Sequence, residues 1–176
     1  VWDTLPAYGD KRIEVLGSNN DGYYFGENNV DWELVTINSG LGINLNSFGD
    51  VVYDGKIWKI GSAGSATVAY SVNGTSFITT GSIPNISSRA VKAVVYNGYI
   101  YIGSYQNSDS SSVHIWRTNN GVDFEAVTLN ANIPARRIVN GGFIVYDNKL
   151  WIIGGRVGAT TTYLRDAWYS TDGADW

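Results

Sequence analysis

One short segment recurs four times along the chain, at intervals of 45, 47 and 52 residues. Each copy has seven residues, with Asn or Asp in third place, Gly or Asn in fourth, Asp or Ser in sixth, and Trp or Phe in last. The copies are residues 26–32, 71–77, 118–124 and 170–176. Similar segments at a near-constant interval are typical of repeat folds, so each interval is expected to hold one structural unit.

A second motif alternates with the first, in residues 51–61, 94–103 and 144–154. In each copy, β-branched and aromatic residues flank a turn pair, which is Asp54-Gly55, Asn97-Gly98 or Asp147-Asn148. These residue types tolerate positive φ and therefore predict type I′ β-hairpins. The seven-residue segment supplies a second hairpin turn, which brings each unit to four short strands.

The predicted fold class is all-β, and the architecture is a β-propeller of four-stranded antiparallel blades, because no segment shows helical periodicity. The approximate blades of this single domain are 1–37, 47–80, 89–129 and 137–176. Residues 49–80 and 92–129 are expected to form complete blades. Residues 11–37 are expected to hold about three strands without the first hairpin, and 141–176 to lack a fourth strand.

The incomplete blades leave two ways to finish the fold. Val1–Leu5 could supply the missing strand and close a small four-bladed ring. Alternatively, the chain is part of a larger propeller that is completed by further sequence or by another copy of the chain. An unpaired strand edge promotes aggregation, and ring closure removes such edges.

The two motifs resemble known repeats. The run from Tyr53 to Gly61 resembles the kelch repeat, and the run from Ser170 to Trp176 resembles the Asp-box (BNR) hairpin of sialidase-like propellers. The resemblance covers about residues 13–176 and implies a β-propeller. A sialidase would also need an arginine triad, a Tyr/Glu nucleophile pair and an Asp acid. The Arg-Ile-Pro element that usually accompanies those enzymes is absent, since residues 132–137 read Asn-Ile-Pro-Ala-Arg-Arg.

Composition excludes several classes of site. The 176 residues contain no Cys and one histidine, His114, so thiol nucleophiles and zinc–thiolate sites are excluded and His-based metal sites or triads are disfavoured. No cofactor is expected. A net charge of −4 argues against nucleic-acid binding, which requires clustered Lys and Arg. The chain also has no apolar run long enough to span a membrane as a helix.

The long connections between strands are expected at the end of the propeller opposite the tight turns, where binding residues commonly lie. Tyrosine rings beside amide and guanidinium donors suit the apolar face and hydroxyl rim of a sugar, although the same composition also occurs in ordinary solvated loops. The candidate binding residues are Tyr105, Asn107, Asp109, Arg156, Tyr163, Arg165, Arg89 and Arg136.

The repeated aromatic residues are expected to be structural. Trp32, Phe77, Phe124 and Trp176 should pack between sheets. The third residues of the same segments, Asn28, Asn73, Asn120 and Asp172, should hydrogen-bond their own turns. Tyr53, Tyr96 and Tyr146 recur in every hairpin, and this uniformity indicates packing.

These observations predict a non-catalytic propeller that recognises glycans or another surface through its long-loop face. An extracellular or virion-surface location is expected, as a secreted lectin or adhesion component. One alternative is a kelch-like module for protein interaction or assembly. Another is a fragment of a sialidase-like or galactose-oxidase-like enzyme. A homo-oligomer that completes the propeller is a further expectation.

Overall fold

The structure is a computed structural model of the 176 residues. It describes residues 7–8, 11–14, 22–26, 33–36, 49–62, 65–84, 91–104, 113–127, 133, 137–157 and 162–176. The described residues form β-strands and turns and contain no helix, so none of them belongs to a helix that could cross a membrane.

The strands form four antiparallel sheets, each a meander in which neighbouring strands follow one another in the chain. The first sheet contains β1 (Ala7–Tyr8), β2 (Lys11–Glu14), β3 (Gly22–Gly26) and β4 (Glu33–Thr36). The second contains β5 (Gly49–Tyr53), β6 (Lys56–Ser62), β7 (Ser65–Ser71) and β8 (Ile78–Ser82). The third contains β9 (Lys92–Tyr96), β10 (Tyr99–Ser104), β11 (His114–Thr118) and β12 (Glu125–Val127). The fourth contains β13 (Arg137–Tyr146), β14 (Lys149–Arg156) and β15 (Ala167–Ser170).

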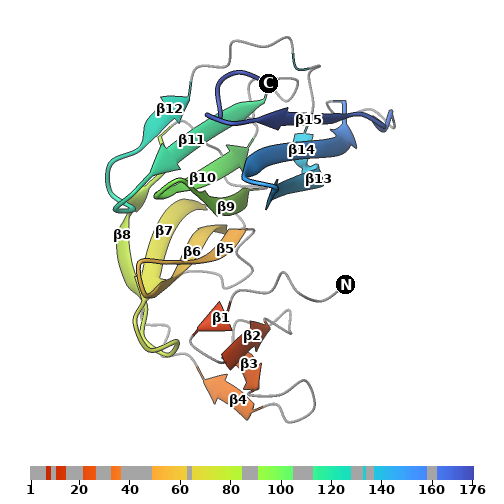
Figure 1. Ribbon diagram of the computed structural model, residues 1–176. Helices are drawn as coiled ribbons and strands as arrows, with labels where there is room; N and C mark the ends of the chain where they lie inside the picture. The colour runs from red at the N-terminus through yellow and green to blue at the C-terminus, as the bar shows by residue number, and fades with distance from the viewer. Residues whose placement is uncertain are drawn as a thin grey trace.

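The four sheets follow one another along an open arc (Figure 1). The first strands of the second, third and fourth sheets, β5, β9 and β13, lie in contact with their neighbours. Radial sheets that share cores are the β-propeller arrangement, and the prediction of an all-β propeller of antiparallel blades is confirmed. The second and third sheets have the four strands expected of them, and the described part of the fourth has three.

The first sheet corrects one prediction. It has four strands because β1 and β2 form a hairpin in which Tyr8 pairs with Lys11. The same pairing joins Tyr53 to Lys56 in the second sheet. The expectation that this unit lacked its first hairpin was therefore wrong. The suggested closing strand, Val1–Leu5, lies outside the described residues.

The first hairpins of the other sheets have the predicted turns. Both central residues of each turn have positive φ, from 46° at Asn97 to 76° at Gly98. This geometry is that of a type I′ turn, and it matches the right-handed twist of the strands it joins.

Two apolar cores hold consecutive sheets together. The first lies between the second and third sheets, where Trp58, Ile60 and Val68 pack with Ile100 and Ile102. The second lies between the third and fourth sheets, where Tyr101 and Ile115 pack with Phe143, Leu150 and Ile152. Strand β10 is consequently buried on both faces, because it lies between two neighbours.

Each of these two junctions also seats an aromatic ring against a glycine. A Cβ atom added to Gly121, in the turn after β11, would overlap the ring of Trp58 in the second sheet. A Cβ on Gly173, in the turn after β15, would lie 2.6 Å from Cε1 of Tyr101 in the third sheet. Glycine therefore allows the two sheets to approach, and it also supplies the positive φ of both turns.

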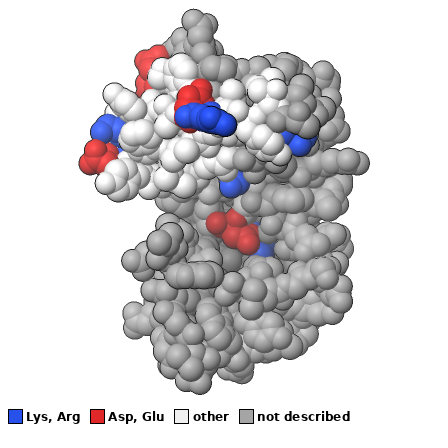
Figure 2. Space-filling model, turned by 90° about the vertical axis from the view of Figure 1, so that its right-hand side faces the viewer, with Lys and Arg blue, Asp and Glu red and all other residues white. Residues whose placement is uncertain are grey.

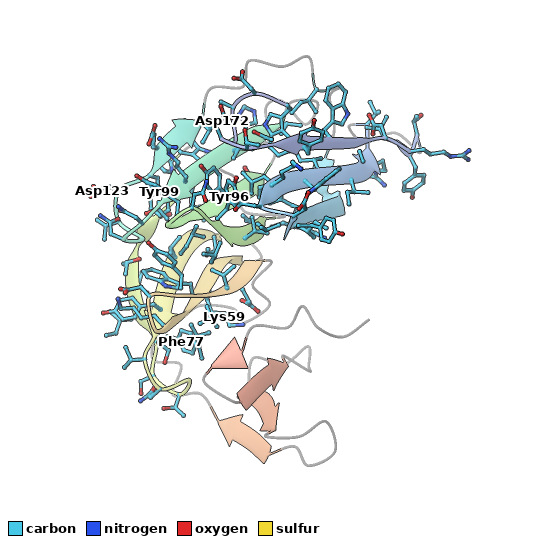
Figure 3. The ribbon with its side chains drawn as sticks, in the orientation of Figure 1. Lys59, Phe77, Tyr96, Tyr99, Asp123 and Asp172 are labelled. Carbon is cyan, nitrogen blue, oxygen red and sulfur yellow. The ribbon has the colours of Figure 1, made fainter. Side chains whose placement is uncertain are left out.

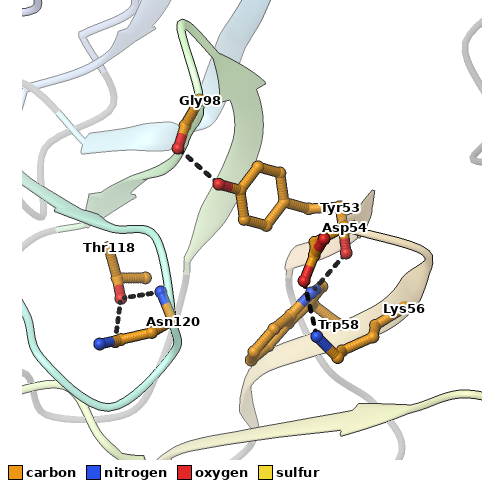
Figure 4. Close-up of polar contacts among 7 residues, drawn as sticks. All are labelled: Tyr53, Asp54, Lys56, Trp58, Gly98, Thr118 and Asn120. Atoms are coloured by element: carbon orange, nitrogen blue, oxygen red, sulfur yellow. Dashed lines mark hydrogen bonds and ion pairs between the residues drawn. The ribbon is translucent and has the colours of Figure 1, made fainter.

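A tyrosine hydroxyl adds a polar link at the same junctions. Tyr53 donates a hydrogen bond of 2.5 Å to the carbonyl of Gly98 in the next sheet (Figure 4). Tyr96, which lies between the third and fourth sheets (Figure 3), is 2.9 Å from the carbonyl of Asn148 and 3.0 Å from that of Thr171. The acceptors Gly98 and Asn148 are each the second of the two central residues of a type I′ turn, so the link repeats at both junctions.

Candidate functional site

The meander places two kinds of connection at opposite ends of the sheets. The type I′ turns and the turns of the seven-residue segments lie at one end, which we call the turn end. The connections from β6 to β7, from β10 to β11, from β14 to β15 and from each sheet to the next lie at the other end, which we call the connection end; all of them except the two residues between β6 and β7 are long. For the second, third and fourth sheets, the turn end is at the left of Figure 1 and the connection end at the right.

The turn end is occupied by its own hydrogen bonds. Oδ1 of Asn73 accepts bonds from the backbone N–H groups of Thr75 and Ser76, and Ser71 Oγ accepts from Gly74 N. Asn120 and Asp172 make the same bonds in their turns. The prediction that these side chains bond their own turns is confirmed for the three described copies; Asn28 lies outside the described residues.

Asp172 shows how strongly such a turn holds a carboxylate. The backbone N–H groups of Asp175 and Ala174 stabilise its charged form and lower the pKa of Asp172 below its usual value. A carboxyl group held ionised by its own turn is a poor general acid. The geometry therefore gives these residues a structural role.

The aromatic residues that close the same segments lie beside the cores. Phe124 packs against the core between the second and third sheets, and Trp176 against the core between the third and fourth. Phe77 is buried, with 5% of its surface exposed. Trp32 lies outside the described residues.

Three of the eight predicted binding residues are described: Arg156 ends β14, and Tyr163 and Arg165 lie between β14 and β15, at the connection end. Arg156 forms an isolated antiparallel bridge with Tyr163, so these two side chains are direct cross-strand neighbours. Backbone bonds from Leu164 N to Gly155 O and from Val157 N to Thr162 O, of 2.9 and 3.0 Å, hold the bridge. The other five predicted residues, Tyr105, Asn107, Asp109, Arg89 and Arg136, lie outside the described residues.

The bridge brings an aromatic ring and a guanidinium group together at the surface. Tyr163 has 66% of its surface exposed, and Arg165 is also exposed. Arg156 is half-buried, and its Nε is itself buried, with no hydrogen-bond partner among the described residues. An exposed aromatic ring can stack on the apolar face of a ligand, and guanidinium N–H groups that reach the surface can donate hydrogen bonds to its hydroxyl groups.

Sequence reasoning missed a buried ion pair close to this end. Nζ of Lys59 lies 2.9 Å from Oδ2 of Asp50, and Lys59 has only 4% of its surface exposed. Burial lowers the pKa of Lys59, while Asp50 opposes that shift. The repeat gave no signal for this pair, because the corresponding positions of β13 and β14 carry other residue types. A neighbouring cation, Lys92, donates to the carbonyl of Gly141 at 2.8 Å.

Two further polar groups face each other where β10 meets β11. Ser104 and the single histidine, His114, are opposite one another in the strand register. Ser104 Oγ and His114 Nε2 are both buried, and neither has a hydrogen-bond partner among the described residues. His114 is the first residue of β11, and within the described residues no group of three His, Cys, Asp or Glu side chains could hold a metal ion.

Among the residues that the structure describes, the connection end carries no patch of a single charge. Figure 2 views this end, and the charged atoms of the described residues appear as separate spots of both signs. The described residues alone therefore build no field of one sign.

Comparison with known proteins relates the chain by fold only. No family model matches the sequence, and no curated protein matches it. Among solved structures, a Bombyx mori GH32 β-fructofuranosidase variant in complex with sucrose is similar, with a TM-score of 0.58 and 14% identity over 98% of this chain and 46% of that one. The Bombyx mori GH32 β-fructofuranosidase without the substitution gives a TM-score of 0.55 and 16% identity, over 94% and 44%. The chain thus spans less than half the length of these β-propeller enzymes.

Proposed function

We propose that this propeller binds a neutral saccharide at its connection end. The observation that carries the proposal is the bridge between Arg156 and Tyr163, which presents an exposed ring beside a guanidinium group. Sugars offer an apolar C–H face that stacks on aromatic rings, and hydroxyl groups that accept hydrogen bonds from N–H donors.

Two further facts support this class of ligand. The described surface of the connection end has no patch of one sign, which suits an uncharged partner (Figure 2). One solved structure with a similar fold holds sucrose. At 14% identity that likeness shows the fold alone, so it serves here to choose sucrose as the first ligand to test.

The test is a binding titration of sucrose and a panel of neutral glycans, followed by saturation-transfer NMR. Tyr163→Ala should weaken binding by about tenfold or more, which corresponds to about 1.4 kcal/mol. Arg156→Gln should weaken it as well. Tyr146→Ala is the matched control, because Tyr146 is 69% exposed, close to the 66% of Tyr163, but belongs to the turn end. Absence of binding to every glycan, or equal binding by all variants, would contradict the proposal.

Glycoside hydrolysis is a second candidate, favoured by the fold likeness to two β-fructofuranosidases. Hydrolysis by paired carboxylates needs two such groups on either side of the scissile bond. Release of glucose and fructose from sucrose distinguishes the candidates. Steady product formation by the purified chain supports catalysis, whereas binding without products supports a recognition module.

A further inference from the structure

The outer face of the fourth sheet is a copy of a face that the chain uses elsewhere for packing. Cross-strand neighbours on this face are Ile144, Trp151 and Tyr169. The corresponding neighbours in the second sheet are Val51, Trp58 and Tyr70. The correspondence extends to the type I′ turns, since Tyr146 and Lys149 stand where Tyr53 and Lys56 stand.

The geometry of the two faces agrees in detail. The rings of Trp58 and Tyr70 are 5.2 Å apart at 46°, and those of Trp151 and Tyr169 are 5.2 Å apart at 44°. The indole N–H donates to the carbonyl of the turn tyrosine in both sheets, at 3.0 Å in the second and 2.9 Å in the fourth. The fourth sheet therefore holds its rings in the orientation that the second sheet uses against the third.

Exposure separates the two faces. In the second sheet, Val51 is 7% and Ile60 0% exposed, because the third sheet covers them. In the fourth sheet, Ile144 is 41% and Ile153 42% exposed. Tyr146 makes no hydrogen bond of the kind that Tyr53 and Tyr96 make to the next sheet, within the described residues. Leu150 and Ile152 are buried on the opposite face, so β14 is covered on one side only.

The edge of the same sheet is also open. Strand β15 pairs with β14, and no fourth strand pairs with it within the described residues, whereas β8 and β12 complete the second and third sheets. A groove of about 340 Å³ lies along this edge, lined by residues 167–171 together with Asp175 and Trp176.

The geometry points to one occupant for both features, which is a polypeptide segment that adds a fourth strand to β15 and continues into a further sheet of the same design. That sheet must offer a carbonyl from a type I′ turn to the Tyr146 hydroxyl. It must also place a glycine against the ring of Trp151, as Gly121 is placed against Trp58.

A second copy of this chain does not meet these requirements. In the first repeat, Asn29 occupies the sequence position that Gly121 and Gly173 hold in later repeats, so the first repeat of another copy lacks the glycine that this junction requires. The second sheet of another copy carries Gly74. However, the first sheet of that copy comes before it in the arc and would be the sheet that faces Trp151 (Figure 1).

The test extends the chain with its own third sheet. Phe77 and Trp176 end equivalent seven-residue segments, so residues 78–127 can be copied after Trp176 in the same register. The copy of β8 then supplies the fourth strand, and the copies of β9 to β12 supply the next sheet. Hydrogen exchange at Ala167–Ser170 should slow by about tenfold or more in the extended protein. Tyr146→Phe should lower the unfolding midpoint of the extended protein and leave that of the original chain unchanged.

The matched control carries Ala at the copied Gly121 position, and it should lose most of the added protection. Unchanged exchange at Ala167–Ser170 in the extended protein would overturn the inference. It would also be overturned if light scattering showed the original chain to be a dimer that Tyr146→Arg dissociates, because the occupant would then be a second copy.

Discussion

The indole ring of Trp58 lies against Gly121, at the point where a side chain on that glycine would begin. Trp58 belongs to β6 of the second sheet, and Gly121 belongs to the turn between β11 and β12 of the third sheet. The same relationship joins Tyr101 to Gly173 one sheet further on. From the second sheet to the fourth, the arc therefore repeats one junction, in which an aromatic ring of one sheet is seated on a glycine turn of the next.

Two glycine substitutions should separate the cost of steric overlap with the neighbouring ring from the cost of placing a side chain at positive φ. Gly121→Ala adds an overlap with Trp58 to the strain of a φ of 70°, and should cost about 3 kcal/mol of the free energy of unfolding. Gly55→Ala is the control, because its φ is 66° and nothing lies within 4 Å, so the strain alone should cost about 1 kcal/mol. Urea unfolding measures both. Equal losses would show that the ring and the glycine are not in contact.

The tyrosine links predict a graded series of Tyr→Phe variants. Tyr96→Phe removes the hydroxyl that bonds carbonyls of the fourth sheet in a part-buried setting, and should cost about 1.5 kcal/mol. Tyr53→Phe removes an exposed link and should cost about 0.5 kcal/mol. Tyr146→Phe should leave the stability of the present chain unchanged, and a loss as large as that of Tyr96→Phe would mean that its hydroxyl is already bonded.

The ion pair of Lys59 predicts unequal costs for two similar substitutions. Asp50→Asn leaves a buried ammonium group without its carboxylate, and should cost about 2 kcal/mol because Asp50 is itself partly exposed. Asp54→Asn breaks the exposed pair with Lys56 and should leave the stability nearly unchanged, because solvent screens the pair. Chemical denaturation of the two variants compares them directly. A neutral Asp50→Asn substitution would mean that the other interactions of Lys59 compensate for the lost carboxylate.

Asp172 predicts part of the acid sensitivity of the protein. Its turn lowers the pKa of the folded state below that of the unfolded chain. The stabilisation is therefore complete above the unfolded value, near 3.8, and is lost as the pH falls through the lower folded value. Asp172→Asn keeps the acceptor oxygen, as Asn73 and Asn120 do, and should flatten the decline of stability in that range. Unfolding midpoints measured between about pH 2 and pH 5 test this, and an unchanged slope would contradict it.

Local sequence signals predicted much of the fold. Asp54-Gly55 and its counterparts specify type I′ turns because few residue types accept positive φ in succession, and such a preference can be read from adjacent residues. The hairpin between Tyr8 and Lys11 was missed because its turn pair reads Gly9-Asp10, the reverse of the usual order. The match of Tyr8 and Lys11 to Tyr53 and Lys56 was the available signal.

Contacts between sheets were beyond what repetition alone could show. Tyr53, Tyr96 and Tyr146 look equivalent in sequence, yet the first two bond the next sheet and Tyr146 is 69% exposed. The difference arises from whether a neighbouring sheet covers the residue, and that depends on distant parts of the chain. The pair of Asp50 and Lys59 escaped prediction because cross-strand register, not sequence spacing, brings the two residues together.

The central claim is that saccharides bind at the connection end, and NMR mapping on the isotopically labelled chain tests it most directly. On titration with the glycan that binds best, amide signals of Arg156, Tyr163 and Ser104 should shift, while those of Asp54, Asn97 and Asp147 at the turn end should not. Shifts confined to the turn end, or no shifts with any glycan, would contradict the account.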